Sequence, residues 1–268
     1  MKVMGIVNVT PDSFSDGGEF LDPELAIRHG LELIEAGADV LDIGGESTRP
    51  GAKAVSAEEE LRRVVPVVEG LVGTVPLSID TAKASVAEAA INAGASIVND
   101  VTGLRGDEGL AALCAGRGVE VVLMHMLGTP RTMQDNPTYD DVVAEVRDFL
   151  LERADLAIEA GIAREKIWID PGIGFGKTLE HNLALLEGTS VFVETGFPVL
   201  VGPSRKAFIG KVDGSKEDHR LGGTIAACLS ALRGGAGMVR VHDVGPVVQA
   251  IRVAEAIAGS AAGPADSR

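Results

Sequence analysis

The chain has 268 residues, 46% of them apolar, which is enough for one large hydrophobic core or two small ones. Its formal net charge of -15 argues against a nucleic-acid partner, because a nucleic-acid surface needs a basic stripe. No apolar run reaches the length of a membrane span, so we expect a soluble protein with no membrane partner.

Short apolar runs recur along the chain, each after an alanine-rich helical pattern that ends in glycine. This form is seen in EAGADVLDIGG from Glu35, NAGASIVNDVTG from Asn92 and RGGAGMVRVHDVG from Arg233, and more loosely in EAGIAREKIWIDPG from Glu159. Because the runs lack polar alternation, they are typical of strands buried on both faces of a parallel sheet. Strands are predicted at residues 4–9, 40–43, 76–79, 97–99, 121–124, 167–169, 199–201 and 238–241.

Patterns with helical spacing lie between the predicted strands, as in AEEELRRVVPVVEGL from Ala57. Eight strands alternating with eight helices in about 250 residues predict an α/β fold, a single (β/α)8 TIM barrel over residues 1–258. A doubly wound sheet is the alternative, but it usually carries G-x-G-x-x-G after its first strand, and NVTPDSFSDGG from Asn8 does not match. Residues 259–268 are small and polar and are predicted to form a disordered tail.

The two cysteines lie far apart in the sequence. Cys114 and Cys228 both occur in alanine-rich, helix-like stretches, and neither has a partner at CxxC spacing. We interpret them as buried small residues in a reducing compartment. The N-terminus also lacks the architecture of a signal peptide, so the predicted location is the cytoplasm.

Polar side chains stand where the predicted strands end. They are Asn8, Asp42, Asp80, Asn99, His125, Asp170, Ser204 with Arg205 and Lys206, and Arg240 with His242. In a barrel the C-terminal strand ends form the active site. A single Asp or Asn at such a place usually caps the next turn. Polar residues at the C-terminal ends of all eight predicted strands would instead place several charges together at one end of the barrel, which indicates a ligand site.

The chemistry of these residues separates into two kinds. A cationic pocket suited to a polyphosphate or another anion would be formed by Arg49, Arg205, Lys206, Arg240 and His242. Asp80 and Asp170 can accept paired N–H groups from a 2-amino-pyrimidinone edge, which guanine and pterins share, and Asn99 can complement it.

The absence of HExxH and of closely spaced Cys and His argues against tightly held zinc. Magnesium bridged to substrate phosphates needs few protein ligands, and Asn8 with Asp12 could supply them.

Three loops have unusual composition. The stretch DPGIGFGKT from Asp170 ends like a P-loop, but Pro171 stands where the first P-loop glycine is required and has no N–H to offer a phosphate. We therefore reject a P-loop. The loops TPDSFSDGG from Thr10 and GGESTRPGAK from Gly44 are longer than βα turns need to be, and we predict that they are mobile lids over a substrate.

These motifs together resemble the dihydropteroate synthases of the pterin-binding barrel superfamily. In chain order the matching stretches are MGIVNVTPDSFSDGG from Met4, DIGGESTRPGA from Asp42, SIDT from Ser78, VND from Val98, LMHMLGTPRTMQ from Leu123, DPGIGFGKT from Asp170, SRKAFIG from Ser204 and RVHDV from Arg240. The resemblance implies a transferase of folate biosynthesis. It would join 6-hydroxymethyl-7,8-dihydropterin pyrophosphate to p-aminobenzoate, giving 7,8-dihydropteroate and pyrophosphate with Mg2+. It also implies a sulfonamide target and a homodimer formed through helices near the C-terminus.

The resemblance further implies roles for single residues. The pterin would be held by Asp80, Asn99, Asp170 and Lys206. The pyrophosphate would be held by Asn8, Arg240 and His242, with the metal at Asn8. The p-aminobenzoate pocket would be shaped by Phe14, Thr48, Arg49, Pro50, Phe175 and Lys206. The catalytic set would be Asn8, Asp12, Arg49, Lys206, Arg240 and His242.

One departure and two alternatives remain. The family commonly has Ser or Arg after Ser204-Arg205-Lys206, where it helps to hold the p-aminobenzoate carboxylate, and this chain has Ala207, which implies weaker affinity for that substrate. A pterin-dependent methyltransferase would share the Asp and Asn contacts but would not need a pyrophosphate pocket. A catalytically silent paralogue would bind a pterin or a partner protein without turnover.

Overall fold

The computed structural model describes residues 1–10, 22–48, 51–52 and 54–261. Four predicted site residues, Asp12, Phe14, Arg49 and Pro50, lie outside these ranges, as does most of the predicted first lid and the end of the predicted tail. Within the described ranges eight parallel strands form one sheet. They are β1 (Lys2–Asn8), β2 (Val40–Gly44), β3 (Leu77–Asp80), β4 (Ile97–Asp100), β5 (Glu120–Met124), β6 (Ile167–Asp170), β7 (Leu200–Val201) and β8 (Met238–Val241).

The sheet closes on itself. Its order is β6-β5-β4-β3-β2-β1-β8-β7. The two outer strands of that order meet through a parallel bridge between Ile169 and Val199, and the Ile169 N–H donates to the Pro198 carbonyl at 3.0 Å. Closure confirms the predicted barrel and excludes the doubly wound alternative, because a doubly wound sheet is open.

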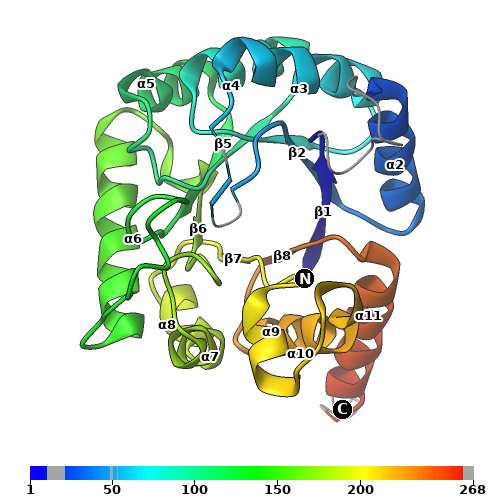
Figure 1. Ribbon diagram of the computed structural model, residues 1–268, viewed down its shortest axis with the longest axis vertical. Coiled ribbons are helices and arrows are strands. Elements are labelled where there is room, and N and C mark those ends of the chain that lie inside the picture. Colours follow the sequence, from blue (N-terminus) through cyan, green and yellow to red (C-terminus); the bar gives the residue numbers. More distant parts are fainter. Residues whose placement is uncertain (11–21, 49–50, 53, 262–268) are drawn as a thin grey trace, which may run out of the picture.

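Helices form a ring outside the strands (Figure 1). They are α2 (Pro23–Glu35), α3 (Ala57–Leu71), α4 (Ala84–Ala93), α5 (Glu108–Arg117), α6 (Val142–Glu159), α7 (Leu179–Glu187), α8 (Thr189–Val193), α9 (Ala207–Asp213), α10 (Leu221–Arg233) and α11 (Val244–Ala261), with 3-10 turns η1 (Arg164–Lys166) and η2 (Glu217–His219). Strands β6 and β7 are each followed by two α-helices instead of the single helix expected. Helix α11 also runs three residues past the predicted end of the barrel at 258.

The barrel interior has an apolar floor. One buried cluster joins an inward side chain from seven strands: Met4, Val40, Ile97, Val122, Trp168, Leu200 and Met238. Side chains of successive strand residues point to opposite faces, so residues two positions further along the same strands also point inward. Those positions include Asp42, Asn99, Asp170 and Arg240. The floor therefore closes one end of the barrel and leaves a polar layer directly above it.

The cysteines lie where the sequence predicted. Cys114 and Cys228 are buried and free, and burial raises the pKa of each thiol to about 12. Among the helices of the described ranges, none combines the length and the apolar character that a bilayer crossing requires.

Candidate active site

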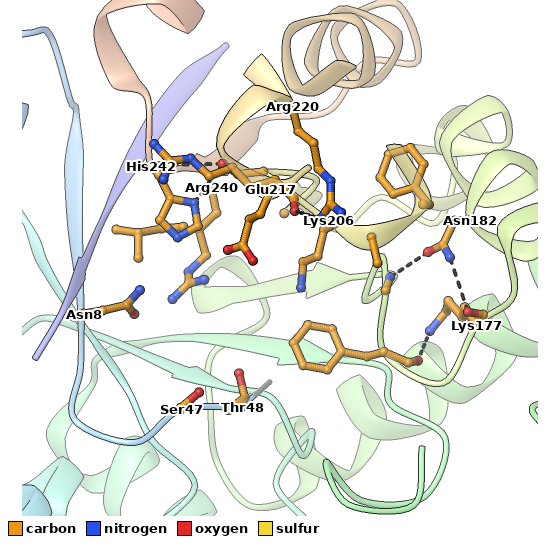
Figure 2. A pocket seen from close by; sticks show the side chains of 18 of the residues that line it. Asn8, Ser47, Thr48, Lys177, Asn182, Lys206, Glu217, Arg220, Arg240 and His242 are labelled. Atoms are coloured by element: carbon orange, nitrogen blue, oxygen red, sulfur yellow. Dashed lines mark hydrogen bonds between the residues drawn. The ribbon is translucent and has the colours of Figure 1, made fainter. Parts of the chain in front are cut away.

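A cavity of about 630 Å³ opens at the C-terminal ends of the strands. The predicted site residues that line it are Asn8, Thr48, Asp80, Phe175, Lys206, Arg240 and His242. In Figure 2, Asn8 and Lys206 approach this space from opposite walls, and Ser47 and Thr48 border it from the β2–α3 loop. Two further predicted residues, Asn99 and Asp170, are buried in the polar layer and do not belong to the lining.

Arg240 spans the barrel interior. Its Nε donates to Asp42 Oδ2 at 2.5 Å and its Nη2 donates to Asp80 Oδ2 at 2.7 Å. The Arg240 side chain is 20% exposed, whereas that of Asp42 is fully buried. Burial disfavours the guanidinium charge, but the Asp42 and Asp80 carboxylates outweigh it and raise the pKa of Arg240. The residue predicted to hold pyrophosphate thus touches a residue predicted to hold the pterin.

Asp42 connects this network to Asn99. Asn99 Nδ2 donates to Asp42 Oδ2 at 3.0 Å, so one carboxylate oxygen serves both Asn99 and Arg240. Asp42 Oδ1 is buried and has no hydrogen-bond partner within the described part of the chain. No role was predicted for Asp42, although it ends a strand like the others. Its place two residues after the floor residue Val40 is the signal that could have identified it.

Asp170 presents a carboxylate of altered acidity. Burial raises the pKa of Asp170 to about 6, and the Gly172 N–H, which donates to Oδ1 at 2.7 Å, opposes the shift. The nearby Lys206 also favours the ionised form. A carboxylate that is ionised near neutral pH in a buried place can accept N–H groups strongly.

His242 is hydrogen-bonded to Ser204 through both its backbone and its ring. The His242 backbone N–H donates to Ser204 Oγ at 3.1 Å, and the same Oγ lies 2.9 Å from His242 Nδ1. The hydroxyl can therefore give its own proton to Nδ1, which leaves the imidazole N–H on Nε2. That arrangement provides a donor for an anion in the cavity.

Arg205 departs in part from its predicted role. It lines the cavity, but its Nε and Nη2 donate to the two carboxylate oxygens of Asp243 at 2.9 and 2.6 Å. Because this paired contact occupies the guanidinium fork, Arg205 acts as an anchor between the β7 and β8 loops. We therefore assign the anion contacts to Lys206, Arg240 and His242.

Lys206 and Phe175 both line the cavity and contact each other. Its Nζ lies 4.0 Å from the centroid of the Phe175 ring, which is a cation–π distance. Several residues on the same cavity lining were not predicted: Glu46, Ser47, Gln134, Asn182, Lys211, Glu217 and Arg220. Of these, Glu46 and Ser47 lie inside the recognised GGESTRPG stretch and Gln134 ends the recognised LMHMLGTPRTMQ stretch, and the others carry no motif that would single them out.

The loop after β6 needs its glycines. Gly172 has φ +68, and a Cβ there would meet the His125 carbonyl oxygen at 1.9 Å. Gly176 has φ +66, and a Cβ there would meet Leu127 Cβ at 2.7 Å. These positions combine a left-handed backbone with close approach to the β5 loop, so only glycine fits. The glycines of DPGIGFGKT therefore serve packing, which confirms that the stretch is not a P-loop.

His125 is the strand-end residue that the structure places elsewhere. It follows inward-pointing Met124 and so points outward, where its ring meets the Phe149 ring of α6 edge-on at 4.8 Å. It is buried and does not line the cavity, and Lys177 Nζ lies 2.9 Å from its Nδ1. Burial, followed by the Lys177 charge, lowers the pKa of His125 to about 2, so the ring stays neutral.

The possible metal ligands in the cavity suit a metal ion that binds together with the substrate better than a metal ion that only protein side chains hold. Within the described ranges no three His, Cys, Asp or Glu side chains gather in ligand geometry. Asn8 lines the cavity and offers an amide oxygen, while Asp12 lies outside the described residues. Mg2+ typically keeps waters and phosphate oxygens and takes only one or two protein ligands, so Asn8 is compatible with it.

Comparison with known proteins gives a consistent pattern. Residues 4–242 match the family of pterin binding enzymes. A dihydropteroate synthase from Synechocystis is 47% identical over 258 residues, which cover 95% of this chain and 89% of that protein. A Xanthomonas albilineans dihydropteroate synthase solved with 4-aminobenzoic acid has 53% identity and a TM-score of 0.90, covering 96% of this chain and 93% of that one. The structure of the X. albilineans enzyme in complex with 7,8-dihydropteroate has 49% identity and a TM-score of 0.87, with the same coverage of 96% and 93%.

Proposed function

The chain belongs to the pterin-binding enzyme family and, within it, to the dihydropteroate synthases, and from this premise we propose how its barrel mouth works. The reaction joins 6-hydroxymethyl-7,8-dihydropterin pyrophosphate to p-aminobenzoate and releases pyrophosphate. One observation carries the assignment of sites. Arg240 contacts Asp80 at 2.7 Å, so the pterin-edge group and the anion group are adjacent in one cavity.

The polar layer is suited to the pterin ring. Asp80, Asn99 and Asp170 lie on three strands at the bottom of the cavity, above the apolar floor. Their oxygens and amide can complement the N–H groups and carbonyl of the amino-pyrimidinone edge. Arg240 donates to one Asp80 oxygen, so a pterin that binds Asp80 competes with the Arg240 guanidinium for that oxygen. This competition favours a turn of the Arg240 side chain toward the pyrophosphate.

The chemistry follows from charge that develops on the leaving group. The bond between the exocyclic methylene carbon and the pyrophosphate oxygen breaks, and its electron pair leaves with pyrophosphate. The dihydropterin ring stabilises the positive charge left on the methylene carbon. The amine nitrogen of p-aminobenzoate then forms the new C–N bond and releases its proton. Because this aromatic amine is neutral near pH 7, no general base is needed for its attack.

The protein's part is to bind the departing anion. Arg240 and His242 Nε2–H lie where the growing negative charge can be stabilised in the transition state. Mg2+, held mainly by the pyrophosphate oxygens with Asn8 as a protein ligand, would neutralise part of the same charge. Lys206 lies near Asp170 and over the Phe175 ring, and these two neighbours support a place for it between the pterin and the p-aminobenzoate.

A product assay tests the function. Purified protein, dihydropterin pyrophosphate, p-aminobenzoate and magnesium are mixed, and release of pyrophosphate is measured together with the mass of dihydropteroate. Stoichiometric formation of both products is the expected result. Pterin binding without product would contradict the synthase and would favour the methyltransferase or the silent paralogue. Omission of magnesium in a parallel reaction tests the metal and is expected to slow pyrophosphate release.

The acidity of Asp170 predicts a pH dependence of pterin binding. Only the ionised carboxylate accepts two N–H groups, and burial raises the pKa of Asp170 to about 6. Burial likewise raises the pKa of Asp80 to about 7. Affinity for 6-hydroxymethyl-7,8-dihydropterin, which has no titrating phosphate, is therefore expected to begin to fall below pH 7 and to fall by about a further tenfold per pH unit below pH 6, where Asp170 also takes up a proton. Titration calorimetry between pH 5 and 8 measures it. In Asp170→Asn the slope of log affinity against pH should be smaller by about one. An unchanged slope would show that another group titrates.

We also propose the homodimer that the resemblance implied, formed through α10 and α11. Their outer faces form an apolar groove of Ile225, Leu229, Pro246, Gln249, Ala250, Val253, Ala254 and Ile257. Val253 is 55% and Ile257 65% exposed. The groove carries no charged side chain although the chain has a net charge of -15, so a second copy can pack there without like-charge contact within the groove.

Disruption of this groove is expected to give monomers. Ile257→Asp places a charge in the apolar contact and should reduce the mass found by light scattering from twice 27.7 kDa to 27.7 kDa at micromolar concentration. Leu183→Asp is the matched control, because Leu183 is 45% exposed on α7, away from the groove. A wild-type chain that is already monomeric, or an Ile257→Asp variant that stays dimeric, would refute this interface.

We propose the cytoplasm as the location. The supporting observation is that Cys114 and Cys228 are kept as buried thiols with raised pKa, a state compatible with a reducing compartment. Fractionation of the native host followed by immunodetection tests it. Recovery in a membrane or secreted fraction would contradict the proposal.

A further inference from the structure

Lys177 is the one residue of the P-loop-like stretch whose place in the reaction is unaccounted for. It is only 2% exposed and is among the largest fully buried side chains of the described residues. Burial lowers the pKa of Lys177 to about 7. A buried lysine is unfavourable unless its donors are satisfied, so its partners indicate what it does.

Three acceptors surround the Lys177 amino group. Nζ lies 2.9 Å from the Phe175 carbonyl oxygen, 2.9 Å from His125 Nδ1 and 3.4 Å from the His125 carbonyl oxygen. A protonated lysine has three N–H donors and no acceptor, so the three acceptors match it. In that protonation state of Lys177, Nδ1 of His125 is the acceptor and the imidazole proton is on Nε2. Figure 2 shows Lys177 at the border of the cavity, with its Nζ joined to the loop backbone at the Phe175 carbonyl.

The neighbouring carbonyl groups of the same loop are held in the same way. Gln134 Nε2 donates to the Gly174 carbonyl at 2.9 Å, and Tyr139 Oη donates to the Gly176 carbonyl at 2.8 Å. Together with Lys177, these side chains fix three successive peptide groups around Phe175. The loop has no regular backbone hydrogen-bond ladder at this place, so the side-chain donors determine its conformation.

The fixed peptide groups determine where the Phe175 ring lies. Its ring lines the cavity and lies against Lys206 Nζ at 4.0 Å. The polar layer of Asp80, Asn99 and Asp170 is built on strands and meets this loop at Asp170, which accepts from the Gly172 N–H and whose pKa the Lys177 charge helps to lower, whereas the Phe175 ring is carried by the loop itself. The two substrate sites therefore differ in their dependence on Lys177.

We propose that Lys177 is a positioning residue for the second substrate: its amino group holds the Phe175 peptide against His125 and so sets the wall that the aromatic amine meets. The proposal rests on the proposed function, because it needs the p-aminobenzoate pocket to lie beside Phe175. Lys177 borders the cavity, and in this proposal its effect is transmitted through the Phe175 carbonyl and ring.

The test is a comparison of Michaelis constants for the two substrates. Lys177→Met keeps the aliphatic length and removes the donors. At pH 8, where Asp170 stays ionised without the Lys177 charge, it is expected to raise KM for p-aminobenzoate about tenfold while KM for dihydropterin pyrophosphate changes less than about twofold. Lys2→Met is the matched control, since Lys2 is exposed at the start of β1, at the opposite end of the barrel, and both constants should stay unchanged. An unchanged KM for p-aminobenzoate, or an equal rise in both constants, would overturn the proposal.

A milder variant covers the case in which Lys177→Met fails to fold. Tyr139→Phe removes only the hydrogen bond to the Gly176 carbonyl, and it is expected to raise KM for p-aminobenzoate about threefold and to leave the pterin constant unchanged. No change in either constant would count against positioning by the loop. If the wild-type chain itself makes no product, the proposed function fails. If the wild type is active and the variants match it, only this inference fails.

Discussion

Replacement of Arg240 by methionine is expected to lower kcat by about 10³-fold, because it removes a donor that acts on charge growing in the transition state. The same change should lower the free energy of unfolding by about 3–5 kcal/mol, because it leaves the fully buried Asp42 without its ion-pair partner. Steady-state turnover and urea denaturation measure the two effects separately.

A double variant distinguishes catalysis from stability. Arg240→Met with Asp42→Asn replaces the unpaired carboxylate by a neutral amide and is expected to recover most of the lost stability while kcat stays low. Recovery of both together would mean that Arg240 acts only by holding the fold. Arg240→Lys offers a further comparison, since it keeps a charge but cannot donate to Asp42 and Asp80 in the observed fork.

Replacement of Lys206 by alanine is the second large effect that we expect. Its loss removes a cation near Asp170 and the cation–π contact with Phe175, so we expect kcat/KM to fall about 10²–10³-fold for both substrates. The free energy of unfolding should change less than in Arg240→Met, because Lys206 is only half-buried, at the N-cap of α9.

The Lys206 variant is assessed with both substrates varied in turn. Lys2→Ala is the control for removal of a positive charge from this acidic chain, and its kinetics should match the wild type. A Lys206→Ala variant that loses affinity for the pterin alone would show that the contact with Phe175 has no part in p-aminobenzoate binding. Full activity would remove Lys206 from the site.

The position of the chemistry follows from side-chain alternation along the strands. On four strands, β2, β4, β6 and β8, the inward floor residue is followed two residues later by a polar residue, as in Val40 and Asp42 or Trp168 and Asp170. The polar groups thus share one layer, screened from solvent on the floor side by apolar packing. In such surroundings fixed donors act strongly on developing charge.

Much of the fold and of the candidate site could be predicted from the sequence alone. The eight apolar runs specify the strands because parallel strands buried on both faces have no polar alternation. The polar strand ends specify the mouth, since in a barrel those ends meet. Seven predicted residues line the cavity, and two more lie directly beneath it. Asp12, Phe14, Arg49 and Pro50 remain predictions, because they lie outside the described residues.

By itself, therefore, the sequence determined the barrel, its polar end and the chemical types gathered there, because these follow from local periodicity and from the order of elements along the chain. Only the tertiary structure decided the partners: that Arg240 reaches Asp42 and Asp80, that Arg205 turns to Asp243, and that His125 points away from the cavity to meet Lys177. The reason is physical. Strand pairing places Lys2 beside Met238, and closure of the barrel brings Arg240 to Asp42, 198 positions away in the sequence. The direction of each side chain depends on which face of its strand or loop the closed barrel buries.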